Sequence, residues 1–187
     1  PLRSLVAETE VGGLRTLTVP DAVVTVSSVS VEGGVVAGDA AMRDGHTTIE
    51  QLEEAAARLA PGLRGRARLR RALAAMDGRS ESPGESRTRM VLSALGLPVE
   101  SQVVIRDRAG GLVGRVDLLV AGRVVVEFDG AVKYQGDSGA DVLMAEKRRE
   151  DRLRELGYEV VRVTWDELAH PERIHAKVRA ALLRRAA

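Results

Sequence analysis

The sequence contains no cysteine, which excludes disulfides, thiol nucleophiles and cysteine-based zinc sites. Aromatic residues make up only 2% of its 187 residues, so the core must be built from aliphatic side chains. No apolar run approaches the roughly 20 residues that a membrane-spanning helix requires, and we expect no membrane association. Because cysteine pairs and a signal-peptide pattern are both missing, nothing indicates secretion, and we expect a cytoplasmic protein.

An excess of charge of one sign is missing as well. The chain has 28 Lys and Arg against 27 Asp and Glu, a formal net charge of +1. This balance argues against a histone-like tail or a polybasic membrane anchor. It does not exclude DNA binding, which depends on where the charges cluster. The chain begins at Pro1 without an initiator Met, so we expect it to be a fragment or a trimmed form of a longer protein.

A change of composition near residues 78–84 predicts an N-terminal, mostly helical region over 1–79, followed by a second domain over 80–187. In the first region, Thr47-Thr48 caps a helix that Pro61-Gly62 ends, and a second helix covers about 63–76.

The stretch from Leu14 to Val36 allows two interpretations. Val23, Val24 and Val26 favour a strand, whereas Pro20-Asp21 is typical of the start of a helix.

The second region has a regular order of elements. We predict a helix over 82–95, strands over 102–106, 114–120 and 123–129, a helix over 141–156, a strand over 158–164 and a helix from Pro171. This α-β-β-β-α-β-α order predicts an α/β (mixed α+β) fold, in which helices flank a mixed four-stranded sheet.

Acidic residues interrupt two otherwise apolar strands. Because strand side chains alternate between faces, the apolar sets are Val116, Leu118 and Val120 in one strand and Val124, Val126 and Phe128 in the next. If these sets share a face, the connecting loop has an odd number of residues, and Asp117, Glu127 and Asp129 share the opposite face. An even loop would bury Asp117 among valines, at a cost of several kcal/mol.

Three carboxylates on one face repel one another, and a hard divalent cation with oxygen ligands relieves that repulsion. The sequence therefore predicts a site for Mg²⁺ (or Mn²⁺), suited to the hydrolysis of phosphodiester bonds. The alternative is that these residues lie at exposed strand ends and only keep the sheet solvated.

Four segments carry a resemblance to a known family: Ser82-Pro-Gly-Glu-Ser86, Arg115-Val-Asp-Leu-Leu119, Val126-Glu-Phe-Asp-Gly130 and the stretch from Glu146 to Trp165. From about residue 80 to 185 the chain resembles the very-short-patch-repair-endonuclease-like group of the PD-(D/E)XK nuclease superfamily. The resemblance implies a restriction-endonuclease-like αβββαβ core and a metal-dependent DNA endonuclease of a DNA-repair type.

The same resemblance implies roles for individual residues. Asp117 would be the principal metal ligand, and Glu127 the second ligand or the carboxylate that orients water. The Phe128 backbone carbonyl and Asp129 would complete the metal shell. Glu85 would approach from the first helix; alternatively, it only accepts the Ser82 amide as part of a capping box.

The chain departs from the superfamily pattern at Asp129, where a Lys is expected. Lys133 and Lys147 are the candidates to assist catalysis instead. Two interpretations follow: an active endonuclease, or a catalytically inactive DNA-binding or regulatory module, linked to a defence or toxin–antitoxin system.

Two arginine-rich stretches are candidates for contact with DNA phosphates. On the long helix these are Arg148 and Arg152; the alternative is a solvated helix with internal pairs such as Lys147–Asp151 and Glu150–Arg154.

The second stretch supplies Arg64, Arg68 and Arg71 as predicted DNA contacts, although an acidic protein partner suits the same composition. Relatives in the group often carry an upstream winged-helix segment, and we expect one before Pro1.

Overall fold

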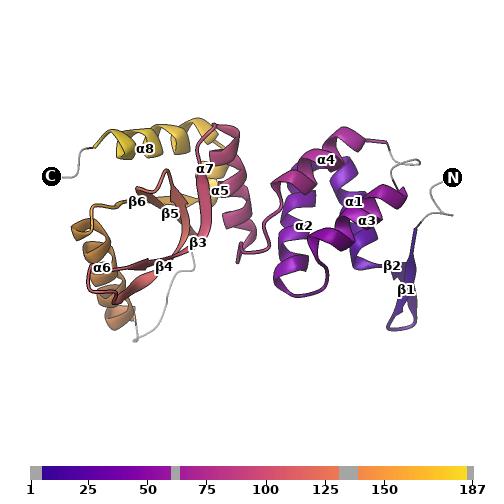
Figure 1. The fold of residues 1–187 in the computed structure, drawn as a ribbon, viewed down its shortest axis with the longest axis horizontal. Coiled ribbons are helices and arrows are strands. Elements are labelled where there is room, and N and C mark those ends of the chain that lie inside the picture. The colour runs from indigo at the N-terminus through magenta and orange to yellow at the C-terminus, as the bar shows by residue number, and fades with distance from the viewer. Residues whose placement is uncertain (1–5, 60–63, 131–138, 185–187) are drawn as a thin grey trace. The chain divides into compact units, whose positions relative to one another are not determined.

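The computed structural model describes residues 6–59, 64–130 and 139–184 (Figure 1). The chain divides into two compact units, residues 1–86 and 87–187. The boundary lies inside helix α5 (Pro83–Ala94). Within the three described ranges, no helix is both long and apolar enough to cross a membrane.

The first unit is mostly helical, as predicted. An antiparallel hairpin of β1 (Glu8–Val11) and β2 (Leu14–Leu17) precedes α1 (Val19–Val29), α2 (Val31–Arg43), α3 (Ile49–Leu59) and α4 (Arg66–Ala75). The hairpin was not predicted.

In the ambiguous stretch from Leu14 to Val36 the strand interpretation is wrong beyond Leu17. Pro20 lies in the first turn of α1, and Val23 and Val24 are buried on one side of that helix. The predicted cap of α3 is confirmed, because the Gln51 amide donates to Thr48 Oγ1 at 3.3 Å.

Buried carboxylates tie the helices of this unit together. Asp21 is fully buried and pairs with Arg58 of α3. Asp39 of α2 is 1% exposed and accepts hydrogen bonds from the Asp77 amide at 2.6 Å and from Ser86 Oγ at 2.7 Å. The second of these contacts joins α2 to the first turn of α5.

The second unit contains the predicted mixed sheet. Its elements after α5 are β3 (Val99–Arg106), β4 (Leu112–Val120), β5 (Val124–Asp129), α6 (Gly139–Glu155), β6 (Glu159–Thr164), α7 (Trp165–Leu168) and α8 (Pro171–Leu183). The strand order is β3-β4-β5-β6; β5 and β6 are parallel, and the other pairs are antiparallel. The predicted fold class and the αβββαβ order are confirmed, and the short helix α7 is an addition.

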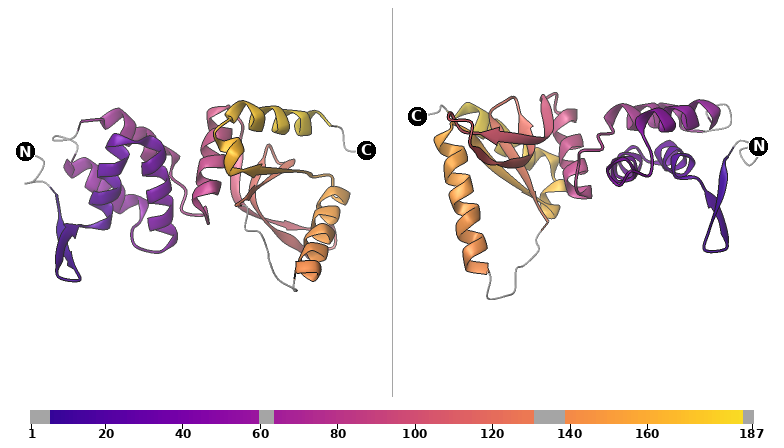
Figure 2. Two further views of the ribbon diagram at one scale, coloured as in Figure 1. Left: turned by 180° about the vertical axis from the view of Figure 1, so that it is seen from behind. Right: turned by 60° about the horizontal axis from the view of Figure 1, so that its bottom comes forward.

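Helices cover both faces of this sheet, with α8 on one side and α6 on the other (Figures 1 and 2). The α8 side is a continuous aliphatic core made of Leu118, Val120, Val124 and Val126 with Leu92 of α5 and Ile174 and Val178 of α8. On the α6 side, Val116, Leu119 and Val125 pack against Leu153 of α6.

The placement of Val116 corrects the predicted faces. Val116 packs on the α6 side, whereas Leu118 and Val120 pack on the α8 side as predicted. Gln102 and Asp117 lie between the Ser101–Leu118 and Val103–Val116 pairs of the β3–β4 register, and Gln102 has a φ of +54°. An L residue in this left-handed region interrupts the two-residue alternation of a strand, so the two strands change faces here.

Candidate functional site

The β4–β5 hairpin brings the two predicted principal ligands onto neighbouring strands. Val120 pairs with Val124, so three residues, 121–123, form the loop. Ala121 and Gly122 adopt positive φ values of 50° and 65°, which suits a tight connection. The odd loop length predicted from the apolar pattern is confirmed.

Asp117 bonds directly to the end of the neighbouring strand. Its Oδ2 accepts a hydrogen bond from the Phe128 backbone N–H at 2.9 Å, just beyond the Leu118–Val126 pair. The donor is the backbone amide of Phe128, and this amide belongs to the peptide bond between Glu127 and Phe128. This hydrogen bond fixes the spacing between the Asp117 and Glu127 backbones.

Glu127 lies in a largely buried setting. Its side chain is 15% exposed and forms an ion pair with Arg149 of α6, whose side chain is 24% exposed. Burial raises the pKa of the Glu127 carboxyl, and the positive charge of Arg149 opposes that rise. The site therefore contains a largely buried carboxylate, Glu127, that is paired with the guanidinium of Arg149.

Arg149 is the residue that the sequence analysis missed. Its Nη1 also donates to the Arg115 carbonyl at 3.2 Å, and its Nε lies 3.5 Å from Glu146 Oε2. The sequence offers one signal that Arg149 faces the sheet. The apolar Leu153 follows four residues later, and residues four apart lie on the same face of a helix. Leu153 is 1% exposed and packs on the sheet.

A series of ion pairs continues from Arg149 along α6 and β6. Glu146 and Glu150 both accept from Arg162 of β6, at 2.9 and 3.1 Å. Glu150 also pairs with Arg154 at 2.5 Å, which confirms one of the internal pairs weighed for this helix. The charges on this side of α6 therefore largely neutralise one another.

Of the two predicted lysines, Lys147 is not brought to Glu127. Lys147 is exposed and lies about 200° around α6 from Arg149. Lys133 lies outside the described residues. Asp129, predicted as a further ligand, is exposed at the end of β5, where it is in register with Thr164 of β6.

Glu85 acts as a helix cap in the first unit. Its Oε2 accepts the Glu81 amide at 2.9 Å, and its own amide donates to Ser82 Oγ at 3.1 Å. The capping alternative is therefore confirmed, with Glu81 in place of Ser82 as the donor. This pairing gives Glu85 a structural use independent of any metal.

The donor set suits a cation that takes few protein ligands. Among the described residues no group of three or more His, Asp or Glu side chains is arranged to hold a metal. Asp117 and Glu127 are two hard oxygen donors on adjacent strands, and Mg²⁺ is commonly bound through one or two carboxylates. The residues therefore fit Mg²⁺, with Arg149 as a rival for Glu127.

The two arginines predicted on α6 differ in their surroundings. Arg152 pairs with Asp107 of the β3–β4 turn at 3.0 Å. Arg148 is exposed on the same helix. Of these two, Arg148 is the better placed to meet a phosphate.

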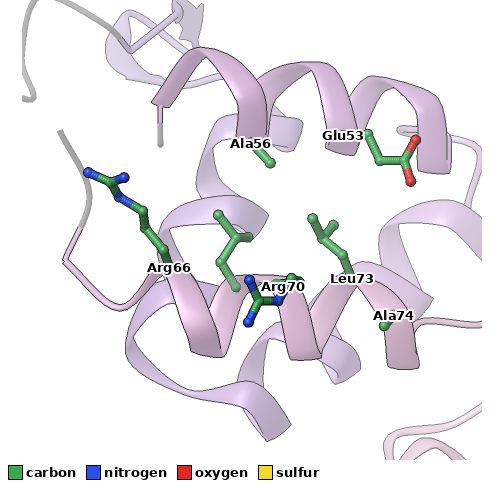
Figure 3. Close-up of a pocket in the computed structure, with 7 residues that line it drawn as sticks. Glu53, Ala56, Arg66, Arg70, Leu73 and Ala74 are labelled. Atoms are coloured by element: carbon green, nitrogen blue, oxygen red, sulfur yellow. The ribbon is translucent and has the colours of Figure 1, made fainter. Parts of the chain in front are cut away.

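The predicted arginines of the first unit lie on and before α4. Arg64, Arg68 and Arg71 are exposed. Beside them, α3 and α4 form an open groove of about 370 Å³, in which Glu53 and Ala56 of α3 face Arg66, Leu73 and others of α4 (Figure 3). The groove contains a single carboxylate, so it offers contacts to anions and no paired ligands for a metal.

Comparison with known proteins identifies relatives in Mycobacterium tuberculosis. The chain is 32% identical, over 143 residues, to an uncharacterized protein of strain CDC 1551 and to one of strain H37Rv. The match covers 75% of this chain and 51% of each relative, so the chain spans about half the length of these relatives. No family model matches the chain, and no solved structure matches it.

Proposed function

We propose that the second unit is a metal-dependent DNA endonuclease that hydrolyses phosphodiester bonds. One observation carries the proposal: Asp117 and Glu127 are joined through the hydrogen bond from the Phe128 amide to Asp117 Oδ2, at 2.9 Å. Two acidic residues are thereby held together at the end of an apolar hairpin, where they otherwise destabilise each other. A function that needs both carboxylates accounts for this arrangement.

In this proposal Asp117 and Glu127 hold Mg²⁺ or Mn²⁺. Such a cation, when bound, lowers the pKa of a coordinated water and stabilises the leaving oxygen. The chain's own part is to fix the two carboxylates. Asp117 is oriented by the Phe128 amide, and Glu127 is kept largely out of water between β5 and α6.

DNA is the proposed substrate because each of the two units presents exposed arginines. Arg148 on α6, and Arg64, Arg68 and Arg71 on the first unit, are exposed cations suited to backbone phosphates. The chain has only four aromatic residues, so contact with DNA is expected to be mainly electrostatic and to weaken steeply with salt.

Nicking of a supercoiled plasmid, and cleavage of single-stranded DNA, with Mg²⁺ or Mn²⁺ test the proposal. We expect the wild-type chain to cut one of these substrates, and Asp117→Asn and Glu127→Gln each to lower the rate at least about a hundredfold. Glu100→Gln is the matched control, since Glu100 is an exposed carboxylate on β3 of the same sheet. Wild-type cleavage that survives both site substitutions would falsify the proposal.

A second candidate function is a catalytically inactive DNA-binding or regulatory module, with a place in a defence or toxin–antitoxin system. The Arg149–Glu127 ion pair favours it, because that cation neutralises a ligand which a metal needs. Salt-sensitive DNA binding by the wild type that is unchanged by chelators, with no cleavage of either substrate, supports this second function over the first.

A further inference from the structure

Arg149 crosses the surface of β4 to reach Glu127, and Gly114 makes room for it. A Cβ atom at position 114 would lie 3.1 Å from Arg149 Cδ and 3.5 Å from its Nη1. The guanidinium therefore lies at Glu127 by virtue of two features. These are the missing side chain at Gly114 and the rotation of α6 that buries Leu153 against the sheet.

The guanidinium and a divalent cation compete for the same carboxylate. Arg149 Nη2 contacts Glu127 Oε1, an oxygen of the proposed metal ligand. Two positive groups on one carboxylate repel each other strongly where water is largely excluded. Binding of a divalent cation to Glu127 therefore weakens the contact of Arg149 and favours its movement away from the carboxylate.

A second carboxylate, that of Glu146, lies close to the guanidinium of Arg149. Its Nε is buried and has no hydrogen-bond acceptor in the described part of the chain. Glu146, one turn earlier on α6, has an oxygen 3.5 Å from this Nε. A small movement toward Glu146 would satisfy the Nε donor and free Glu127.

We propose that Arg149 is a positioning residue that competes with the divalent cation for Glu127. In the metal-free chain the guanidinium occupies Oε1; when the cation binds, the guanidinium moves onto Glu146. Arg149 thereby sets the metal concentration at which the site fills. This inference rests on the proposed function, since it takes Glu127 to be a metal ligand.

Calorimetric titration of the full 187-residue chain with MgCl₂ and MnCl₂ measures this competition. The variants are Arg149→Met, Arg149→Lys and Arg154→Met. Arg154 is the matched control because it lies on the same helix, is 57% exposed and pairs with Glu150. We expect Arg149→Met to bind the cation at least about tenfold more tightly than the wild type. Arg149→Lys, which keeps the charge, should stay close to the wild type, and so should Arg154→Met.

A second measurement follows Arg149 itself. In wild-type NMR spectra the Nε–Hε resonance of Arg149 is identified by its loss in Arg149→Met. We expect it to shift when Mg²⁺ is added, because the guanidinium leaves Glu127 for Glu146. The Arg154 resonance should not move. An Arg149 resonance that stays unchanged at saturating Mg²⁺ would contradict the movement.

The outcomes separate this inference from the proposed function. Tighter binding by Arg149→Met cannot come from loss of the fold, which only weakens a site. Equal or weaker binding by a folded Arg149→Met overturns the competition while leaving the metal site in place. If only Arg149→Met binds the cation, the competition is supported, and the proposal that the wild-type chain is a metal-dependent enzyme is contradicted. Absence of binding in all four proteins overturns both.

Discussion

Asp39 is expected to be a major source of stability in the first unit. It is 1% exposed, and its two carboxylate oxygens accept from the Asp77 amide at 2.6 Å and from Ser86 Oγ at 2.7 Å. It thereby links α2 both to the chain after α4 and to the start of α5. We predict that Asp39→Ala destabilises this unit by about 3–5 kcal/mol.

The magnitude follows from the two hydrogen bonds. Each bond to a charged group contributes about 1.5–3 kcal/mol, and the recovered cost of burying the carboxylate lowers the sum. Ser86 is 1% exposed, so Asp39→Ala leaves its hydroxyl buried without this acceptor. Asp39→Asn keeps the shape and one acceptor oxygen, and we expect it to lose about 1–3 kcal/mol.

Urea unfolding followed by far-ultraviolet circular dichroism measures these losses. The control is Asp44→Ala at the end of the same helix, where the carboxylate is 48% exposed and pairs with Arg43. We expect that control to cost about 0–1 kcal/mol. An Asp39→Ala protein within about 1 kcal/mol of the wild type would refute the reasoning, because buried carboxylate bonds would then contribute no more than surface ones.

Three further predictions concern the sheet. Because burial raises the pKa of Glu127, the folded chain holds its proton more tightly than the unfolded chain. Wild-type stability should therefore fall, relative to Glu127→Gln, as the pH rises from about 4.3 through the folded pKa, in urea titrations across that range. Gly114→Ala should displace Arg149, since the new Cβ lies 3.1 Å from its Cδ, and should tighten Mg²⁺ binding in calorimetry, but less than Arg149→Met does. Phe128→Leu should change the emission of Trp165, the single Trp, because it removes an edge-to-face ring contact at 4.8 Å; an unchanged spectrum would contradict that contact.

Much of the candidate site was predictable because it depends on local patterns. A carboxylate among buried valines is so costly that only an odd loop places Asp117 and Glu127 acceptably, and the loop has three residues. The helix cap at Thr48 could also be predicted from the sequence, because its donors and acceptors lie within one helical turn.

Other features depend on contacts that the sequence pattern does not contain. Val116 changes face next to a position where Gln102, on a different strand, has a φ of +54°. The exposed β1–β2 hairpin was missed because its short strands have no buried face to produce an alternating pattern.

The sequence by itself determined the order of elements, the mixed sheet and the odd length of the loop between β4 and β5. Each follows from apolar periodicity and from the cost of burying charge, which act over a few residues. Only the tertiary structure decided which cation meets Glu127. Lys147, one of the two predicted cations, is exposed about 200° around α6 from Arg149. The packing of Leu153 on the sheet sets the rotation of α6, and that packing brings Arg149 to the carboxylate.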